Sequence, residues 1–437
     1  MKFKVLGNII YIDAYFIPED EVCPLCGSNK IYKNGHTIKT IKHCTYYTSL
    51  FIVKCHIQNY KCKKCNHIFR EKNTFANENE QLSRETIFVI LDKLKYYTAT
   101  FESVARDLHL NRQNIIDVFD RYVDYIPSST LPEIMCFDEK HINKGLSDKS
   151  YSFVILDWKS IKIYDMLPSR HKRSLEYYFG RFSLERRQKV KYIIIDMWES
   201  YKDIAKRYFK NAKIAVDSFH VMENINKAMN QIRIKVMQKY NLKTDELDDN
   251  HPYYYVLKKY HLYFLKLFDD IKDFNHYSKK LKMWLNKYNL MKYMLDIDDE
   301  LKLAYELSED YREFNKTANE ENCKDELDGL IAKFFNSKLE PFIEVAKTLS
   351  TWKEYILNSF ITIKDCPGID GKPRRLSNGP IEGINSMIEK ININGNGYSN
   401  FDRFKNRCIY VINKEYIIQG VPKKSKSYSK KIDKKKK

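Results

Sequence analysis

Hydrophobic positions change their spacing several times along the chain, and each change predicts a different kind of element. Apolar runs of strand length occur at 133–139, 151–158 and 162–167, and the strongest buried run lies within 190–201. Two stretches of helical character, "SLEYYFGRF" and "YKDIAKRYF", flank that last run, and "AKIAVDSFH" supplies one further strand. The alternation of strands and helices predicts an α/β domain over residues 129–220.

The order of these elements, three strands, a helix, a strand, a helix and a strand, is that of the first part of a ribonuclease-H-like core. Residues 221–370 return to helical spacing and contain no strand-like run, so they predict an all-helical insertion. The turn-rich stretch "CPGIDGKPRRLSNGP" then leads back into a second part of the core, predicted at 371–420.

A helix-turn-helix domain is predicted upstream, at residues 76–128. In "FESVARDLHLNRQNIIDVFDRYV" one helix and a second helix are separated by a short turn at 109–111, and Asn111 is suited to cap the second. Arg112, Gln113 and Asn114 would then point outward from the start of that helix and reach base edges or phosphates in a major groove. The alternative is a plain helical hairpin without contact to DNA.

The cysteines are concentrated near the start of the chain. Of ten cysteines, six precede residue 66, and in a cytosolic protein such clustering favours a metal site over disulfides. The pairs Cys23/Cys26 and Cys62/Cys65 can each form a tight turn, and together they predict a closed, structural Zn²⁺ site in a zinc ribbon over residues 1–75. Basic residues beside the second pair are candidate DNA contacts, or simply a solvated rim: Lys63 and Lys64.

Length and charge narrow the class of partner. The chain of 437 residues is long enough for two to four domains, and its net charge is 76 − 57 = +19. An excess of this size favours a polyanionic partner such as nucleic acid, although a Lys-rich composition alone could produce it. The tail at 421–437 is predicted to be a disordered, Lys-rich segment. With no long apolar run and no signal-peptide pattern, a cytoplasmic, nucleoid-associated location is expected.

Three acids carry the candidate chemistry. Asp138 and Asp196 are predicted at the ends of neighbouring strands, and Glu382 in the first turn of a helix that begins near Pro380. Phosphoryl transfer on DNA commonly uses two divalent ions held by carboxylates, so these acids predict a site for Mg²⁺ or Mn²⁺. Asp217 is the best substitute for Asp196. His220 would either approach a substrate phosphate or pack.

These motifs resemble the insertion-sequence transposases of the ISL-three family. The resemblance extends from "CPLCGS…YKCKKCNHIF" through "CFDEK", "IIDMWESY" and "AVDSFHV" to "LSNGPIEGINSMIEKI…GYSNFDRFKNR". It implies a DDE transposase with Asp138, Asp196 and Glu382 as the catalytic acids, whose zinc ribbon and helix-turn-helix bind terminal inverted repeats. A Lys-Arg pair common after the third acid is absent here, where Asn392-Ile393 stand, but Arg403 and Arg407 remain available for DNA.

The resulting interpretation is a metal-dependent transposase that cleaves and joins double-stranded DNA as a homodimer or higher oligomer on element ends and target. Two other interpretations belong to different classes. One is a catalytically inactive, sequence-specific DNA-binding regulator derived from a transposase, and the other is a nuclease without strand transfer.

Overall fold

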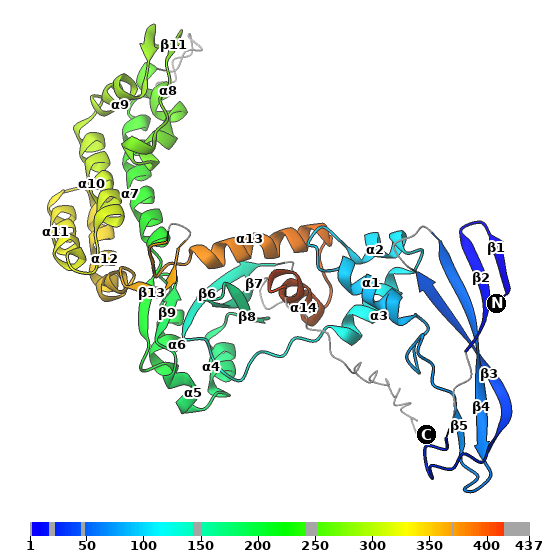
Figure 1. Cartoon of the computed structure of the whole chain (residues 1–437). Coiled ribbons are helices and arrows are strands. Elements are labelled where there is room, and N and C mark those ends of the chain that lie inside the picture. The colour runs from blue at the N-terminus through cyan, green and yellow to red at the C-terminus, as the bar shows by residue number, and fades with distance from the viewer. Residues whose placement is uncertain are drawn as a thin grey trace, which may run out of the picture. The chain divides into compact units, whose positions relative to one another are not determined.

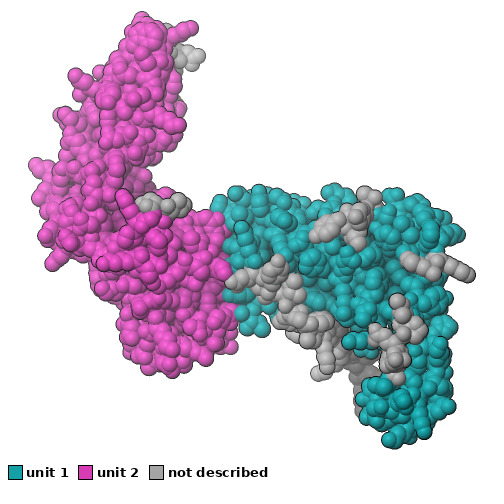
Figure 2. Space-filling view, viewed as in Figure 1, with its two compact units in different colours: residues 1–126, 142–147, 385–437 teal, residues 127–141, 148–384 magenta. Residues whose placement is uncertain are grey.

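The computed structural model describes residues 2–16, 22–44, 49–142, 151–241, 251–368 and 371–414. The chain divides into two compact units (Figure 2): unit 1 holds residues 1–126, 142–147 and 385–437, and unit 2 holds residues 127–141 and 148–384. Unit 1 therefore draws on both ends of the sequence, with unit 2 inserted between them. The predicted disordered tail at 421–437 lies outside the described residues.

A five-stranded sheet forms the first half of unit 1 (Figure 1). It consists of β1 (Lys2–Leu6), β2 (Ile9–Tyr15), β3 (Ile31–Cys44), β4 (Leu50–Cys62) and β5 (Ile68–Arg70), in the order β1-β2-β4-β3 with β5 also paired to β4. The antiparallel pairing of β3 and β4 runs from Ile31 opposite Cys62 to Cys44 opposite Leu50. This long pairing brings the loop before β3 close to the loop after β4, where the two cysteine pairs lie.

Helices form the rest of unit 1. They are α1 (Arg84–Lys93), α2 (Phe101–Asp107), α3 (Arg112–Tyr122), α14 (Phe401–Ile412) and residues 385–394 of α13 (Gly379–Asn394). α14 completes their core: the ring of Tyr410 meets Phe119 edge-on with centroids 5.9 Å apart, and its hydroxyl donates to the Leu91 carbonyl at 3.0 Å. The second predicted part of the core, 371–420, is thus divided, because α14 packs against α1–α3.

The sheet of unit 2 is mixed. Its strands are β6 (Ile134–His141), β7 (Tyr151–Asp157), β8 (Lys162–Leu167), β9 (Tyr192–Ile195) and β10 (Lys213–Val216), in the order β10-β9-β6-β7-β8. β6, β7 and β8 are antiparallel, whereas β9 and β10 run parallel to β6. The expectation that the fourth strand borders the first is confirmed. The connections contain α4 (Lys172–Gly180), α5 (Leu184–Gln188) and α6 (Glu199–Tyr208).

The remainder of unit 2 is mainly helical. It contains α7 (Ser218–Gln238), α8 (Pro252–Lys259), α9 (Lys287–Leu295), α10 (Asp299–Thr317), α11 (Cys323–Asn336) and α12 (Glu340–Asn358), with short 3-10 turns at His261–Leu265 and Phe268–Asp270. Among the helices that the structure describes, none combines the length and hydrophobicity needed to span a bilayer.

The prediction of an all-helical insertion is wrong in two places. A hairpin of β11 (His276–Ser278) and β12 (Met283–Leu285) lies between α8 and α9, and a second hairpin pairs β13 (Thr362–Pro367) with β14 (Pro373–Arg375). β11 and β12 have three residues each and are too short to show an alternating pattern. β13 has six residues but is mostly exposed, so its sequence lacks the apolar run of a buried strand.

Candidate functional site

Aspartates follow two neighbouring parallel strands of the sheet in unit 2. Asp196 comes directly after β9, and Asp217 directly after β10, where it also occupies the N-cap position of α7. Because the carboxyl ends of parallel strands meet at one edge, both side chains lie at the same edge as the end of β6.

Asp138 was expected at the end of its strand, but β6 continues to His141. Pairing with β9 stops at Cys136, whereas pairing with β7 extends to His141 opposite Tyr151. Asp138 therefore lies two residues beyond the last residue of β6 that pairs with β9. The strand continues to His141 because β7, on the other side of β6, still pairs with it. On the side facing β9 it still occupies the edge of the sheet, next to Asp196.

The carboxyl of Asp138 is in a partly desolvated, negatively charged environment. Burial raises its pKa to about 7, with a further contribution from the charge of Asp196. One oxygen accepts a hydrogen bond from the backbone N–H of Glu139 at 2.7 Å. The Glu139 side chain is engaged elsewhere: it pairs with Arg170 and accepts from the Tyr201 hydroxyl at 2.6 Å. Both carboxylate oxygens of Glu139 are therefore engaged by Arg170 and Tyr201 rather than open to a cation.

Asp196 is paired with a histidine from α7. Nε2 of His220 lies 2.5 Å from Oδ1 of Asp196, and this hydrogen bond is the main cause that raises the pKa of His220 to about 9. At neutral pH the imidazole is therefore protonated and donates to the carboxylate. Sequence reasoning offered phosphate contact or packing for His220, and the structure shows it holding Asp196 instead.

Asn378 connects the acids to the start of α13. Its side-chain Nδ2 donates to Oδ1 of Asp196 at 3.4 Å, and its backbone N–H donates to Oδ1 of Asp217 at 3.1 Å. Its carbonyl accepts from the backbone N–H groups of Ile381 and Glu382 at 2.9 and 3.2 Å, which begins the helix. The contact of Asn378 with two acids distant in sequence carries no local signal in the sequence.

Glu382 lies in the first turn of α13, as predicted. The buried side chains of Ile381 and Ile384 anchor this turn, whereas the Glu382 side chain is exposed. Desolvation raises the pKa of Glu382, and the negative charges of Asp217 and Asp196 raise it further. Asp196 is thus coupled electrostatically both to Asp138 and to Glu382.

Two oxygens at this site suit a hard cation. Oδ2 of Asp217 and Oδ1 of Asn378 are buried and accept no hydrogen bond from the described part of the chain. Asp217 itself is only 2% exposed, and burial raises its pKa. A carboxylate so enclosed is poorly placed to meet a phosphodiester, which favours Asp196, whose side chain is 19% exposed.

The three acids do not form a compact ligand set by themselves. Among the described residues, the four cysteines are the one group of three or more potential metal ligands whose ligand atoms all lie within 4.8 Å of one another. The three acids do not meet this criterion. Like charges repel, so carboxylates without an ion between them are expected to stand further apart than when they share one. The chemistry of the donors, all oxygen, nevertheless fits Mg²⁺ or Mn²⁺.

The cysteines meet in unit 1 as the spacing predicted. Sγ of Cys23 lies 3.5 Å from Sγ of Cys65, and Sγ of Cys26 lies 3.6 Å from Sγ of Cys62. Four sulfurs about 2.3 Å from a tetrahedral zinc ion would be separated by about 3.8 Å, so these thiols could hold zinc with little movement. Cys44 and Cys55 are buried in the sheet, away from this group.

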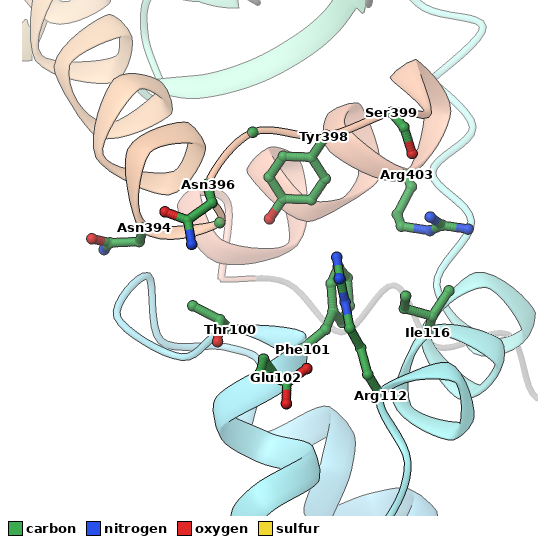
Figure 3. Close-up of a pocket in the computed structure, with 12 residues that line it drawn as sticks. Thr100, Phe101, Glu102, Arg112, Ile116, Asn394, Asn396, Tyr398, Ser399 and Arg403 are labelled. Carbon is green, nitrogen blue, oxygen red and sulfur yellow. The ribbon is translucent and has the colours of Figure 1, made fainter.

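The predicted DNA contacts in unit 1 differ in accessibility. Lys63, Lys64, Arg112 and Gln113 are exposed, and Asn114 is half-buried. Arg112 also lines a cavity of about 510 Å³ between the start of α2 and α3 on one side and the turn before α14 on the other (Figure 3). Arg403 lines the same cavity, where two of its guanidinium nitrogens bind the carboxylate of Asp120 at 2.6–3.1 Å.

Arg407 requires a correction. It is 1% exposed, and its guanidinium donates to the backbone carbonyls of Tyr96 and Ala99 at 2.9 and 2.7 Å. A charged residue on an amphipathic helix is usually exposed, but this one ties α14 to the loop between α1 and α2. Arg407 is therefore not available at the surface for DNA, and we do not retain it among the candidate contacts.

Comparison with known proteins gives one finding. A family model described as a transposase matches residues 135–408, which is more than half of the chain and includes Asp138, Asp196, Asp217 and Glu382. The matched range begins after the cysteine-containing sheet. No curated protein matches the chain.

Proposed function

The chain belongs to the ISL-three family of transposases, and from this premise we propose that it is a DDE transposase that cleaves and joins DNA at the terminal inverted repeats of an insertion sequence. The observation that carries the proposal is the position of Asp196. It lies at the carboxyl edge of the sheet and is coupled electrostatically to both Asp138 and Glu382. Carboxylates that share metal ions must lie at one edge of the fold, and Asn378 supports this arrangement: its side chain donates to Asp196, and its carbonyl accepts from the first turn of the helix that carries Glu382.

The sheet supports a ribonuclease-H-like core. Three antiparallel strands, β6 to β8, are followed by two strands, β9 and β10, that extend the sheet on the other side of β6. This order brings the first and fourth strands together, which is what two metal-binding acids on separate strands need. The mainly helical segment between β10 and α13 would then be an insertion that separates the third acid from the other two in sequence.

We propose that Asp138, Asp196 and Glu382 hold Mg²⁺ or Mn²⁺. When bound, divalent ions at such a site activate the attacking oxygen and stabilise the leaving oxygen in phosphoryl transfer. His220 keeps one oxygen of Asp196 oriented through its Nε2 proton, and Asn378 fixes the start of α13 relative to the same carboxylate. The exposed side chain of Glu382 leaves the outer side of the site open to a DNA backbone.

Unit 1 would supply recognition of the element ends. The four cysteines would hold a structural zinc ion that ties the loops on either side of β3 and β4, with Lys63 and Lys64 beside it. α2 and α3 form a helix pair compatible with a helix-turn-helix, and the exposed Arg112 and Gln113 begin its second helix. Binding through these groups would be strongly dependent on salt.

The test uses the zinc-loaded full chain and a labelled duplex that carries one end of the element. Wild type is expected to cleave the duplex with Mg²⁺ and to join pre-cut ends to a second DNA. Asp196→Asn should bind the end with unchanged affinity but should not cleave it. Asp217→Asn is the comparison at the neighbouring strand: cleavage that is retained in Asp196→Asn but lost in Asp217→Asn would move the role of second acid to Asp217.

The same assay separates the other interpretations. A DNA-binding regulator would bind the end equally well as wild type and as Asp196→Asn, with no cleavage by either. A nuclease without strand transfer would cleave the duplex but would yield no joined product from pre-cut ends.

A further inference from the structure

We propose that the hairpin of β11 and β12 is a binding site for single-stranded DNA. The hairpin lies at the end of the helical part of unit 2, beside α8 (Figure 1), and it plays no part in the acid site. The inference rests on the proposed function, because a transposase exposes unpaired strands when it cuts. It concerns a separate surface with a ligand of its own.

The two faces of the hairpin differ in chemistry. Tyr277 and Trp284 lie directly opposite each other in the register, and their ring centroids are 5.9 Å apart. Both are exposed, by 50% and 61%, whereas Ser278 and Leu285 on the other face are buried. Strand residues alternate between faces, so the hairpin packs one face on the helices and presents a pair of aromatic rings to solvent.

Positive charge surrounds these rings. The turn between the strands reads Lys279-Lys280-Leu281-Lys282, and Lys279 and Lys282 are exposed. Across residues 251–295 there are nine lysines and three aspartates, with no arginine or glutamate, so the segment carries 9 − 3 = +6. Charge of this sign and density is complementary to a phosphodiester backbone.

Two lysines near the hairpin are held against one tyrosine ring of α8. Nζ of Lys280 lies 4.8 Å from the centroid of the Tyr255 ring, and Nζ of Lys259 lies 5.3 Å from the same ring on its own helix. Cation–π contacts of this kind restrict the lysine side chains without neutralising their charge. The charges next to the hairpin are therefore partly ordered before any ligand arrives.

The combination favours unpaired DNA over other occupants. Bases in a duplex are already stacked, whereas unpaired bases can stack on exposed aromatic rings while lysines contact the phosphates. A second copy of this hairpin would bring two segments of the same charge together, which opposes self-association through this face. The exposed aromatic pair and the basic turn thus point to one ligand, a single strand.

The experiment measures the affinity of the zinc-loaded full chain for a labelled oligothymidylate, in an Asp196→Asn background so that cleavage plays no part. The double variant Tyr277→Ala/Trp284→Ala is expected to bind the single strand roughly tenfold more weakly. Tyr177→Ala removes a tyrosine on α4 that is even more exposed, at 78%, and as the control it should leave the affinity unchanged. Trp284→Phe with Tyr277 intact should retain most of the affinity, because it keeps an aromatic face.

A second variant tests the charges. Lys279→Gln/Lys282→Gln should reduce the slope of log binding constant against log salt concentration for single-strand binding by about 1.4, the value for two lost phosphate contacts. Equal affinities for all variants, or an equal loss for an uncut duplex end, would overturn the proposal, as would a change of oligomeric state in Trp284→Ala. If the wild type does not cleave DNA but the hairpin variants lose single-strand affinity as expected, the result would count against the proposed function alone.

Discussion

His220 Nε2 lies 2.5 Å from Oδ1 of Asp196, the same oxygen to which Asn378 donates at 3.4 Å. The carboxylate proposed as the central metal ligand is thus paired with a protonated imidazole, whose pKa is raised to about 9. A divalent ion that binds Asp196 must share Oδ1 with the imidazolium of His220 or bind the other carboxylate oxygen, Oδ2.

Replacement of His220 should separate metal affinity from rate. In His220→Ala the competing positive charge is gone, so the Mg²⁺ concentration that gives half-maximal cleavage should fall. The maximal rate should fall as well, by about tenfold or more, because Asp196 loses the hydrogen bond that orients it. A Mg²⁺ titration of cleavage measures both quantities. A variant that needs more Mg²⁺ than wild type would contradict the electrostatic argument, and Glu223→Gln is a control at the other partner of His220.

Asp138→Asn should stabilise the protein in the absence of Mg²⁺ while it abolishes cleavage. The pKa of Asp138 is raised from about 3.9 in an unfolded chain to about 7. The folded state therefore binds more protons than the unfolded state in that interval, and stability falls as the pH rises through it. Above about pH 7 the ionised carboxyl of Asp138 lowers the free energy of unfolding by at most roughly 4 kcal/mol. The uncharged side-chain amide of the Asn variant avoids this loss.

Thermal melts at about pH 5 and pH 8, with zinc retained and Mg²⁺ omitted, check this prediction. The gain in Tm from Asp138→Asn should be larger at the higher pH. Added Mg²⁺ should raise the Tm of wild type more than that of the variant. Equal gains at both pH values would show that the carboxyl is not held in a desolvated, like-charged environment.

Cys26→Ser should reduce the zinc content from about one ion per chain and weaken binding to the element end. One of the four thiolates of a closed site is lost, and the loops before β3 and after β4 are no longer tied together. Cys55→Ala is the matched control, since Cys55 is buried in the same sheet but is not a member of the group. Elemental analysis and end-binding titrations measure the two effects, and full zinc retention in Cys26→Ser would refute the site.

Arg112 and Arg407 should give opposite phenotypes. Arg112→Ala removes an exposed residue, so DNA binding should weaken while the Tm stays the same. If Arg112 contacts a phosphate, the slope of log binding constant against log salt concentration should also fall by about 1. Arg407→Met leaves the carbonyls of Tyr96 and Ala99 without their donor and should cost roughly 2–4 kcal/mol of stability. Parallel melts and binding titrations distinguish the two. A stable Arg407→Met with weakened DNA binding would show that Arg407 contacts DNA after all.

The sequence predicted those features that depend on local pattern. The neighbouring strands that carry Asp138 and Asp196, the first-turn position of Glu382 and the meeting of the four cysteines all follow from periodicity and spacing. The contacts of Asn378 and the burial of Arg407 could not be predicted, because each depends on partners far away in sequence. The hairpin at Tyr277 and Trp284 could not be predicted either, because strands of three residues are too short for the alternation of polar and apolar positions to be recognised.

The division of the chain also has a consequence for synthesis. Unit 1 packs α14 against α1–α3 through Tyr410 and Arg407, yet all of unit 2 is encoded between them. A ribosome must therefore pass residue 412 before the proposed end-binding unit can acquire its last helix. Chains that terminate early would lack this helix, so prematurely released fragments should make poor competitors for the element ends, and recognition should be confined to copies that already contain every acid.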